Sequence, residues 1–261
     1  NSGGPLFNLD GDVVGINSQI YTRSGGSMGL SFAIPASVAR NVVAQLKDHG
    51  SVARGWLGVS IQEVDKELAQ SFGLAKPEGA LVAQVMPGGP ADEGGILAGD
   101  IITAFNGKPI LFSSDLPHQV GLVTPGTPAE LVLMRNGNQK TLRLTVGQLP
   151  DENGTLAQRG KNNGATKTIN GPLGLQVEDL ADMQRKRLQI GGGVVVREIR
   201  PGSAAAKAGL QPADVIVQLG FAAVESVADF RQIAAGLPKG SVQPIRFYRD
   251  GSPVFRSIVI E

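Results

Sequence analysis

Short apolar runs alternate with polar and glycine-rich turns along most of this 261-residue chain. The run Val13-Val14-Gly15-Ile16 predicts a buried strand within residues 12–20, and residues 30–34 predict a second strand after a polar loop over 21–28. A helical period follows, so we expect a helix that begins after Pro35, is capped by Ser37 and ends at His49-Gly50. The apolar stripe of this helix is Val38, Val42, Val43 and Leu46.

Beyond about residue 54 the same motifs occur twice in the same order. The first copy contains Trp56-Leu57-Gly58-Val59, Met86-Pro87-Gly88-Gly89, Asp100-Ile101-Ile102 and Arg135-Asn136-Gly137, and the second contains Pro172-Leu173-Gly174-Leu175, Arg200-Pro201-Gly202-Ser203, Asp214-Val215-Ile216 and Arg249-Asp250-Gly251. Asp100 and Asp214 are 114 positions apart (214 − 100), and so are Arg135 and Arg249 (249 − 135). This period far exceeds the roughly 20–50 residues of solenoid repeats, so it indicates a tandem domain duplication.

The domain organisation follows from this repeat. We expect one unit over residues 1–50, a first repeated domain over 54–149, a polar linker over 150–168 and a second repeated domain over 169–261. Because the apolar runs are short and the chain holds 36 glycines, the predicted fold is mainly β with short helices.

Composition excludes several classes of function. The net charge of +1, without a long basic run, gives no electrostatic case for nucleic-acid binding. No stretch approaches the roughly 20 apolar residues of a membrane span. The chain has no cysteine, which excludes disulfides and thiolate metal sites, and nothing in it predicts another metal or a cofactor.

The first residues, Asn1-Ser2-Gly3-Gly4-Pro5, carry candidate chemistry. Glycines beside a serine permit positive φ and leave room for backbone N–H groups that stabilise an oxyanion. This segment resembles the nucleophile loop of a trypsin-like serine protease. A serine nucleophile also needs a histidine base and an orienting carboxylate, which precede the serine in trypsin-like enzymes. Only Asn1 precedes Ser2, so we expect the chain to be the downstream part of a protease and inactive by itself.

The repeated unit resembles a circularly permuted PDZ domain of the kind found in bacterial proteases. The resemblance implies that Trp56-Leu57-Gly58-Val59 is a carboxylate-binding loop, with Arg54 adding positive potential and 115–123 forming the opposite wall. A bound peptide would add as a strand to a sheet edge. The implied peptide-contacting residues are Arg54, Trp56, Leu57, Gly58, Val59, Leu116, Val120 and Val123 in the first copy, and Leu173, Gly174 and Leu175 in the second.

The second copy departs from the family pattern at two places. Ala213 replaces the usual glycine before the aspartate, and Gly220-Phe221 replaces a polar turn. These departures predict altered loops, and they leave open whether this copy binds peptide or serves assembly.

Four segments together resemble the HtrA/Do family of serine endoproteases, over the whole chain and closest to the DegP-like type with two PDZ domains. They are Asn1–Pro5, Val14–Asn17, Gly29–Pro35 and Arg54–Val59. The fold implied is the C-terminal part of a trypsin-like β-barrel followed by two PDZ domains. The resemblance implies Ser2 as nucleophile and oxyanion-hole donor, Asn1 and Gly3 as its loop, and a specificity loop over residues 19–30 that includes Gln19, Gly29 and Leu30.

The same resemblance implies an ATP-independent protease without metal or cofactor. It would degrade misfolded proteins in the bacterial periplasm, hold exposed C-termini in its PDZ domains and assemble into trimers or larger cages.

Alternatives remain. The two histidines, His49 and His118, both follow the serine at positions that this family does not use for a base. A non-enzymatic tandem PDZ scaffold is the main alternative. A PDZ-bearing intramembrane metalloprotease would need His-Glu-x-x-His, which the chain lacks.

Overall fold

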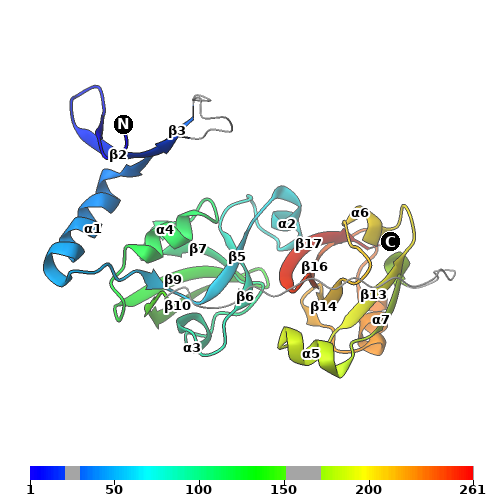
Figure 1. The fold of residues 1–261 in the computed structure, drawn as a ribbon. Helices are drawn as coiled ribbons and strands as arrows, with labels where there is room; N and C mark the ends of the chain where they lie inside the picture. The colour runs from blue at the N-terminus through cyan, green and yellow to red at the C-terminus, as the bar shows by residue number, and fades with distance from the viewer. Residues whose placement is uncertain (21–29, 151–171, 261) are drawn as a thin grey trace.

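The structure, a computed structural model, describes residues 1–20, 30–150 and 172–260 (Figure 1). A small N-terminal sheet with one helix is followed by two β-domains (Figure 1). Every strand pairing is antiparallel, and the helices are short. The prediction of a mainly β fold with short helices is confirmed.

The N-terminal unit contains β1 (Pro5–Phe7), β2 (Val13–Ile20), β3 (Ser31–Pro35) and α1 (Ala36–His49). The strands form one sheet in the order β1-β2-β3. The helix ends as predicted, because Gly50 takes a φ of 71° and its N–H donates to the Leu46 carbonyl at 3.0 Å. The assignment of Ser37 as N-cap is wrong. Extended Pro35 is the N-cap and makes no side-chain cap, so Ser37 already lies in the first turn.

The apolar side chains of this unit are unexpectedly exposed. Val13 and Val14 on β2 are 47% and 44% exposed, and Phe32 on β3 is 51% exposed. The strand over Val13–Ile20 was therefore predicted correctly, but its predicted burial is wrong. A single three-stranded sheet with one helix lacks the second packed layer that buries both sheet faces.

The first β-domain, here called PDZ1, has one main sheet in the order β10-β9-β7-β6-β5, with β5 at an edge. A short pair, β4 with β11, lies apart from this sheet. Its elements are β4 (Gly55–Trp56), β5 (Val59–Glu63), α2 (Lys66–Ser71), β6 (Ala80–Val85), α3 (Pro90–Glu93), β7 (Ile101–Phe105), β8 (Lys108–Pro109), α4 (Asp115–Gly121), β9 (Pro128–Arg135), β10 (Asn138–Thr145) and β11 (Gly147–Gln148).

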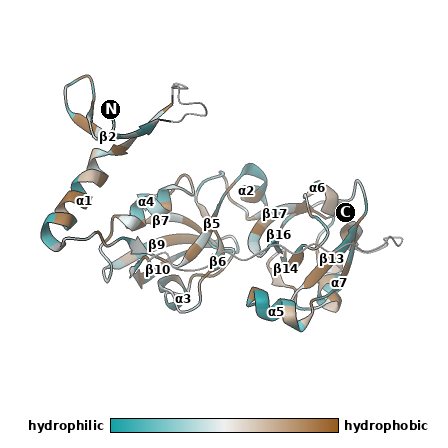
Figure 2. Cartoon of the chain, viewed as in Figure 1, coloured by the Kyte–Doolittle hydropathy of each residue, from teal (hydrophilic) through white to brown (hydrophobic). Residues whose placement is uncertain are grey.

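The second β-domain, PDZ2, repeats this topology with the sheet order β12-β13-β14-β16-β17. Its elements are the 3₁₀ turn η1 (Pro172–Gly174), β12 (Leu175–Asp179), α5 (Asp182–Leu188), β13 (Val194–Ile199), α6 (Ala204–Lys207), β14 (Val215–Leu219), β15 (Ala222–Ala223), α7 (Val227–Gly236), β16 (Val242–Arg249) and β17 (Ser252–Val259). In Figure 2, β13 is largely hydrophobic, whereas α5 is hydrophilic and contributes no buried residue. The matching strand orders show that the sequence repeat is a repeat of fold.

Each domain contains the same buried Asp–Arg ion pair. The carboxylate of Asp100, 1% exposed, accepts hydrogen bonds from Arg135 Nε at 2.7 Å and from the Leu97 N–H at 2.8 Å. Asp214 and Arg249 repeat the pair, with Nε at 2.8 Å and Nη2 at 2.7 Å. The carboxylate raises the pKa of each arginine through this hydrogen bond. The pair explains why the aspartate and arginine motifs recur together.

The two departures in the second copy keep the fold intact. Ala213 has a φ of 73°, and the corresponding Gly99 has a φ of 92°. Ala213 therefore holds a left-handed conformation that disfavours a side chain. Gly220, with a φ of 60°, still joins β14 to β15 through a tight turn. The neighbouring Phe221 is 48% exposed and lies against PDZ1.

Candidate functional site

The loop between β4 and β5 presents two free backbone donors. The carbonyl of Leu57 accepts from the Ala91 N–H, and that of Gly58 accepts from the Met86 N–H, both at 2.8 Å. The N–H groups of Leu57 and Gly58 donate to no residue that the structure describes. Carbonyls turned inward and N–H groups left unpaired make this loop suited to an anionic oxygen ligand.

Gly58 has a steric reason to be glycine. Its φ is 77°, and a Cβ there would lie 3.1 Å from Cη2 of Trp56. The indole of Trp56, the single tryptophan of the chain, therefore packs against the loop and would report on its occupancy.

An apolar cluster that includes Leu57 lies next to the two donors. Leu57, Leu116 and Val120 are 3%, 2% and 4% exposed and belong to one hydrophobic cluster. Half-buried Val59 and Val123 pack against the same cluster. Leu116 and Val120 come from α4, so the structure brings the loop together with the helix that the resemblance assigned as the opposite wall. Arg54 is exposed next to the loop, and its carbonyl accepts from the Leu149 N–H.

The position of α4 is fixed at both ends. A Cβ on Gly55 of β4 would overlap the carbonyl oxygen of Val120, so β4 can lie directly against the end of α4 only with glycine there. At the other end, Glu63 of β5 accepts from the N–H of Ser113 at 2.9 Å and from its hydroxyl at 2.5 Å. We call this contact the Glu63 latch. Sequence reasoning missed it, because Glu63 and Ser113 are 50 positions apart.

The second domain has a related but tighter arrangement. Leu173 and Leu175 are 9% and 1% exposed, and Gly174 has a φ of 74°. A Cβ on Gly174 would overlap the side chain of Ser203. The residue of PDZ1 that corresponds to Ser203 is Gly89 (203 − 114), which has no side chain. A corresponding latch is present, since Asp179 accepts from the Val227 N–H at 2.7 Å.

The serine loop at the N-terminus is a tight turn. The Gly4 N–H donates to the Asn1 carbonyl at 3.0 Å, and Gly3 has a φ of 83°, as in a type II turn. The Ser2 hydroxyl donates to the carbonyl of Ser18 at 2.6 Å. Among the described side chains, no histidine or acid pairs with this hydroxyl. His118 lies on α4, with Nδ1 2.8 Å from the Ser114 carbonyl oxygen.

The expected specificity loop over 19–30 is described only at its ends. Gln19 on β2 and Leu30 before β3 are exposed. Gly29 and the expected linker, apart from Pro150, lie outside the described residues. Within residues 1–20, 30–150 and 172–260, no cluster of three or more potential metal-ligating side chains occurs. None of the described helices is long and apolar enough to cross a membrane.

Comparison with known proteins now identifies the class. A PDZ domain profile matches residues 55–146 and 171–258, so the chain belongs to the PDZ domain family. Over 98% of its length it is also 54% identical to a DegP-like periplasmic serine endoprotease of Pseudomonas fulva (strain 12-X). A relative with the same name from Hahella chejuensis is 53% identical over 98% of the chain. The resemblance to DegP-like members of the HtrA/Do family is confirmed.

The chain spans about half the length of these curated relatives, 53% and 54% respectively. Among solved structures, the HtrA-type protease AlgW with a tripeptide aligns with 57% of this chain and 50% of its own, at 40% identity and a TM-score of 0.49.

Proposed function

We propose that PDZ1 binds the free C-terminus of peptides that end in an apolar residue. The observation that carries this proposal is the pair of unpaired N–H groups at Leu57 and Gly58, which lie beside an apolar cluster and next to the edge strand β5. The peptide carboxylate accepts from the two N–H groups, and the last side chain enters the pocket formed with Leu116 and Val120. The peptide backbone extends the sheet along β5.

Selection by this pocket should be loose. A hydrophobic pocket discriminates one methylene by only about 1–3 kcal/mol, so peptides ending in different aliphatic residues should bind within a narrow range of affinity. Such selection suits the recognition of misfolded proteins, which share exposed apolar segments rather than one sequence.

We propose that the whole protein is an ATP-independent serine endopeptidase of the bacterial periplasm, which assembles as a trimer or larger cage. Its DegP-like relatives support the activity and the location. Ser2 is then the nucleophile, and its N–H is one oxyanion donor.

The 261-residue chain should be inactive by itself, because the Ser2 hydroxyl is bonded to a carbonyl rather than to a base. Casein digestion by this chain that disappears in Ser2→Ala would contradict this expectation.

The test of peptide binding compares a fluorescent peptide that has a free C-terminal carboxylate and a terminal apolar residue with the same peptide amidated. Binding of the free acid that is lost on amidation, with a change in Trp56 fluorescence, supports carboxylate capture at this loop. Equal binding of both peptides, or no binding of either, would refute it.

A further inference from the structure

PDZ2 contacts PDZ1 through one deeply buried aromatic side chain. Phe255 lies on the edge strand β17 of PDZ2 but is 0% exposed, and it packs in a hydrophobic cluster whose other members all belong to PDZ1. Those members are Val64, Leu68, Ala69, Phe72, Leu81, Ala83 and Ile101. The rings of Phe255 and Phe221 both meet Phe72 edge to face, at centroid distances of 5.7 and 6.0 Å. We call this contact the Phe255 dock.

A second contact joins the domains through the polar backbone. The side-chain amide of Gln62 donates from Nε2 to the Phe255 carbonyl oxygen at 3.0 Å and accepts from the Phe255 N–H at 3.0 Å. This pair reproduces the hydrogen bonds that a neighbouring strand would make. PDZ1 thereby covers part of the open edge of β17, which would otherwise present unpaired backbone groups. Figure 1 shows α2 of PDZ1 next to β16 and β17, where it contacts both strands.

Gln62 lies on the same strand that borders the proposed peptide groove. Side chains alternate between the two faces of a strand, so Ile61 and Gln62 point to opposite faces of β5. Val59 and Ile61 pack against the core cluster that includes the groove residues Leu116 and Val120. Because β5 is an edge strand, the sheet holds it only through β6, and that pairing is irregular between Ser60 and Ile61. The Gln62 contact therefore fixes the groove strand in addition to its pairing with β6 and the Glu63 latch.

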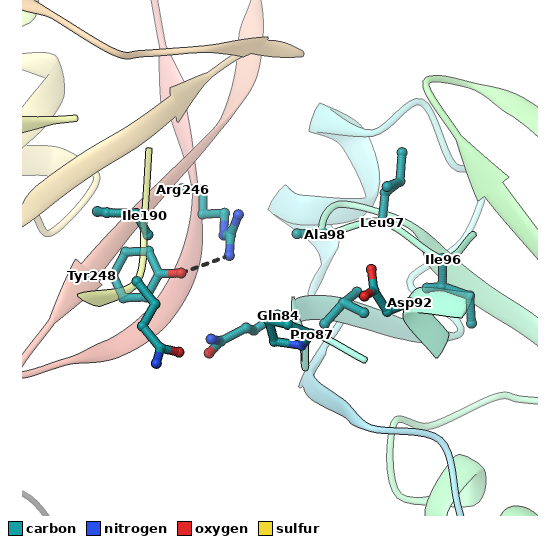
Figure 3. A pocket seen from close by; sticks show the side chains of 11 residues that line it. Gln84, Pro87, Asp92, Ile96, Leu97, Ala98, Ile190, Arg246 and Tyr248 are labelled. Carbon is teal, nitrogen blue, oxygen red and sulfur yellow. Dashed lines mark hydrogen bonds between the residues drawn. The ribbon is translucent and has the colours of Figure 1, made fainter. Parts of the chain in front are cut away.

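A cleft borders the interface. A cleft of about 250 Å³ between the domains is lined by Leu97 and Asp92 of PDZ1 and by Ile190, Arg246 and Tyr248 of PDZ2, among others (Figure 3). The Arg246 guanidinium lies 6.0 Å from the centroid of the Phe255 ring and donates to the Tyr248 hydroxyl at 3.1 Å. Burial lowers the pKa of Arg246, and its Nε has no partner among the described residues. The apolar contact between the domains is thus bordered by a partly buried arginine whose Nε has no partner among the described residues.

We propose that PDZ2 acts as an intramolecular support for the peptide groove of PDZ1. The docked Phe255 and the Gln62 amide hold β5 from the face opposite the groove, so they preorganise the strand on which the peptide adds. Undocking loosens β5 and weakens peptide binding. Because coupling between two equilibria is reciprocal, a bound peptide also favours the docked arrangement. This inference rests on the peptide-binding function proposed above.

The test uses the 261-residue chain and two variants that act on different parts of the dock. Phe255→Ala removes the aromatic insertion. Gln62→Met keeps the length of the side chain and removes only its two hydrogen bonds. Met183→Ala, at an 84% exposed position on α5, is the matched control outside the dock. Domain separation is measured by small-angle X-ray scattering, peptide affinity by fluorescence anisotropy, and folding by circular dichroism.

We expect Phe255→Ala to raise the radius of gyration and to weaken peptide binding about 5-fold or more, the low end of typical allosteric couplings. Gln62→Met should weaken binding about 3-fold with both domains folded, in line with the loss of a hydrogen-bonded contact. Met183→Ala should change neither property.

Two groups of outcomes separate the coupling from the proposed function. If the unmodified chain fails to bind the free-acid peptide, the peptide-binding function itself is wrong. If it binds, but folded Phe255→Ala binds equally well with its domains apart, the coupling is overturned. It is also overturned if Gln62→Met retains full affinity, or if Phe255→Ala leaves the domains docked.

Discussion

Asp100→Asn should strongly destabilise PDZ1, because it neutralises the acid of a buried pair while the arginine stays. Asp100 is 1% exposed and accepts from two nitrogens of Arg135 and from the Leu97 N–H. An asparagine in the same rotamer turns an NH₂ group toward these donors. Breaking one side of a buried ion pair costs about 3–5 kcal/mol. The Arg135 side chain is 18% exposed and reaches water in part, so we expect a loss near the lower end, about 3 kcal/mol.

Urea unfolding followed by Trp56 fluorescence measures this loss in PDZ1. With a slope of about 2 kcal/mol per molar urea, the midpoint should fall by about 1.5 M. Asp214→Asn is the matched control, because it breaks the same pair in the domain that holds no tryptophan. That variant should shift the Trp56 midpoint by less than a third as much, while the circular dichroism transition broadens toward lower urea.

A double variant tests the cause of the destabilisation. Replacing Asp100 and Arg135 together by leucine removes both charges, so no uncompensated charge stays buried. This variant should recover at least half of the stability lost in Asp100→Asn. A midpoint unchanged in Asp100→Asn, or a double variant as unstable as the single one, would refute the assignment of the pair as a buried clamp.

Three further predictions concern the loops and the groove. Gly58→Trp should abolish binding of the free-acid peptide without unfolding PDZ1, since φ is 77° and a Cβ already approaches Trp56 at 3.1 Å; unchanged affinity in anisotropy would exclude this loop as the binding site. Ala213→Gly should raise the free energy of unfolding of PDZ2 by up to about 1 kcal/mol, because relief of left-handed strain outweighs the greater freedom of glycine in the unfolded chain. The reciprocal Gly99→Ala should lower the free energy of unfolding of PDZ1. Calorimetry that shows the opposite signs would contradict the assignment of backbone strain to Ala213. Glu63→Ala should raise the affinity for an eight-residue peptide relative to a three-residue peptide, because the Glu63 latch joins the two groove walls at the end away from the carboxylate loop. If titration calorimetry finds the same ratio of the two affinities, the latch does not limit the length of peptide that the groove accepts.

The sequence by itself determined the duplication, the mainly β fold and the positions where the backbone needs special freedom. Helix ends and tight turns depend on neighbouring residues, so the sequence alone indicates the helix end at Gly50 and the departure at Ala213. The spacing of Asp100 from Arg135, repeated in the second copy, marked a shared structural need. It did not reveal that the two side chains form a hydrogen bond, because a separation of 35 positions along the chain does not determine a distance in space.

The tertiary structure alone decided which surfaces meet. Val13 and Val14 read as a buried strand, yet their burial depends on a second layer that lies outside the local sequence. The contact between Gln62 and Phe255 spans 193 positions, and no local pattern marks either residue as an interface residue. Phe72, Phe221 and Phe255 are ordinary apolar positions in the sequence. They form the Phe255 dock only because two separate sheets place them at the same contact. Long-range contacts of this kind follow from the packing of folded surfaces rather than from local backbone preferences.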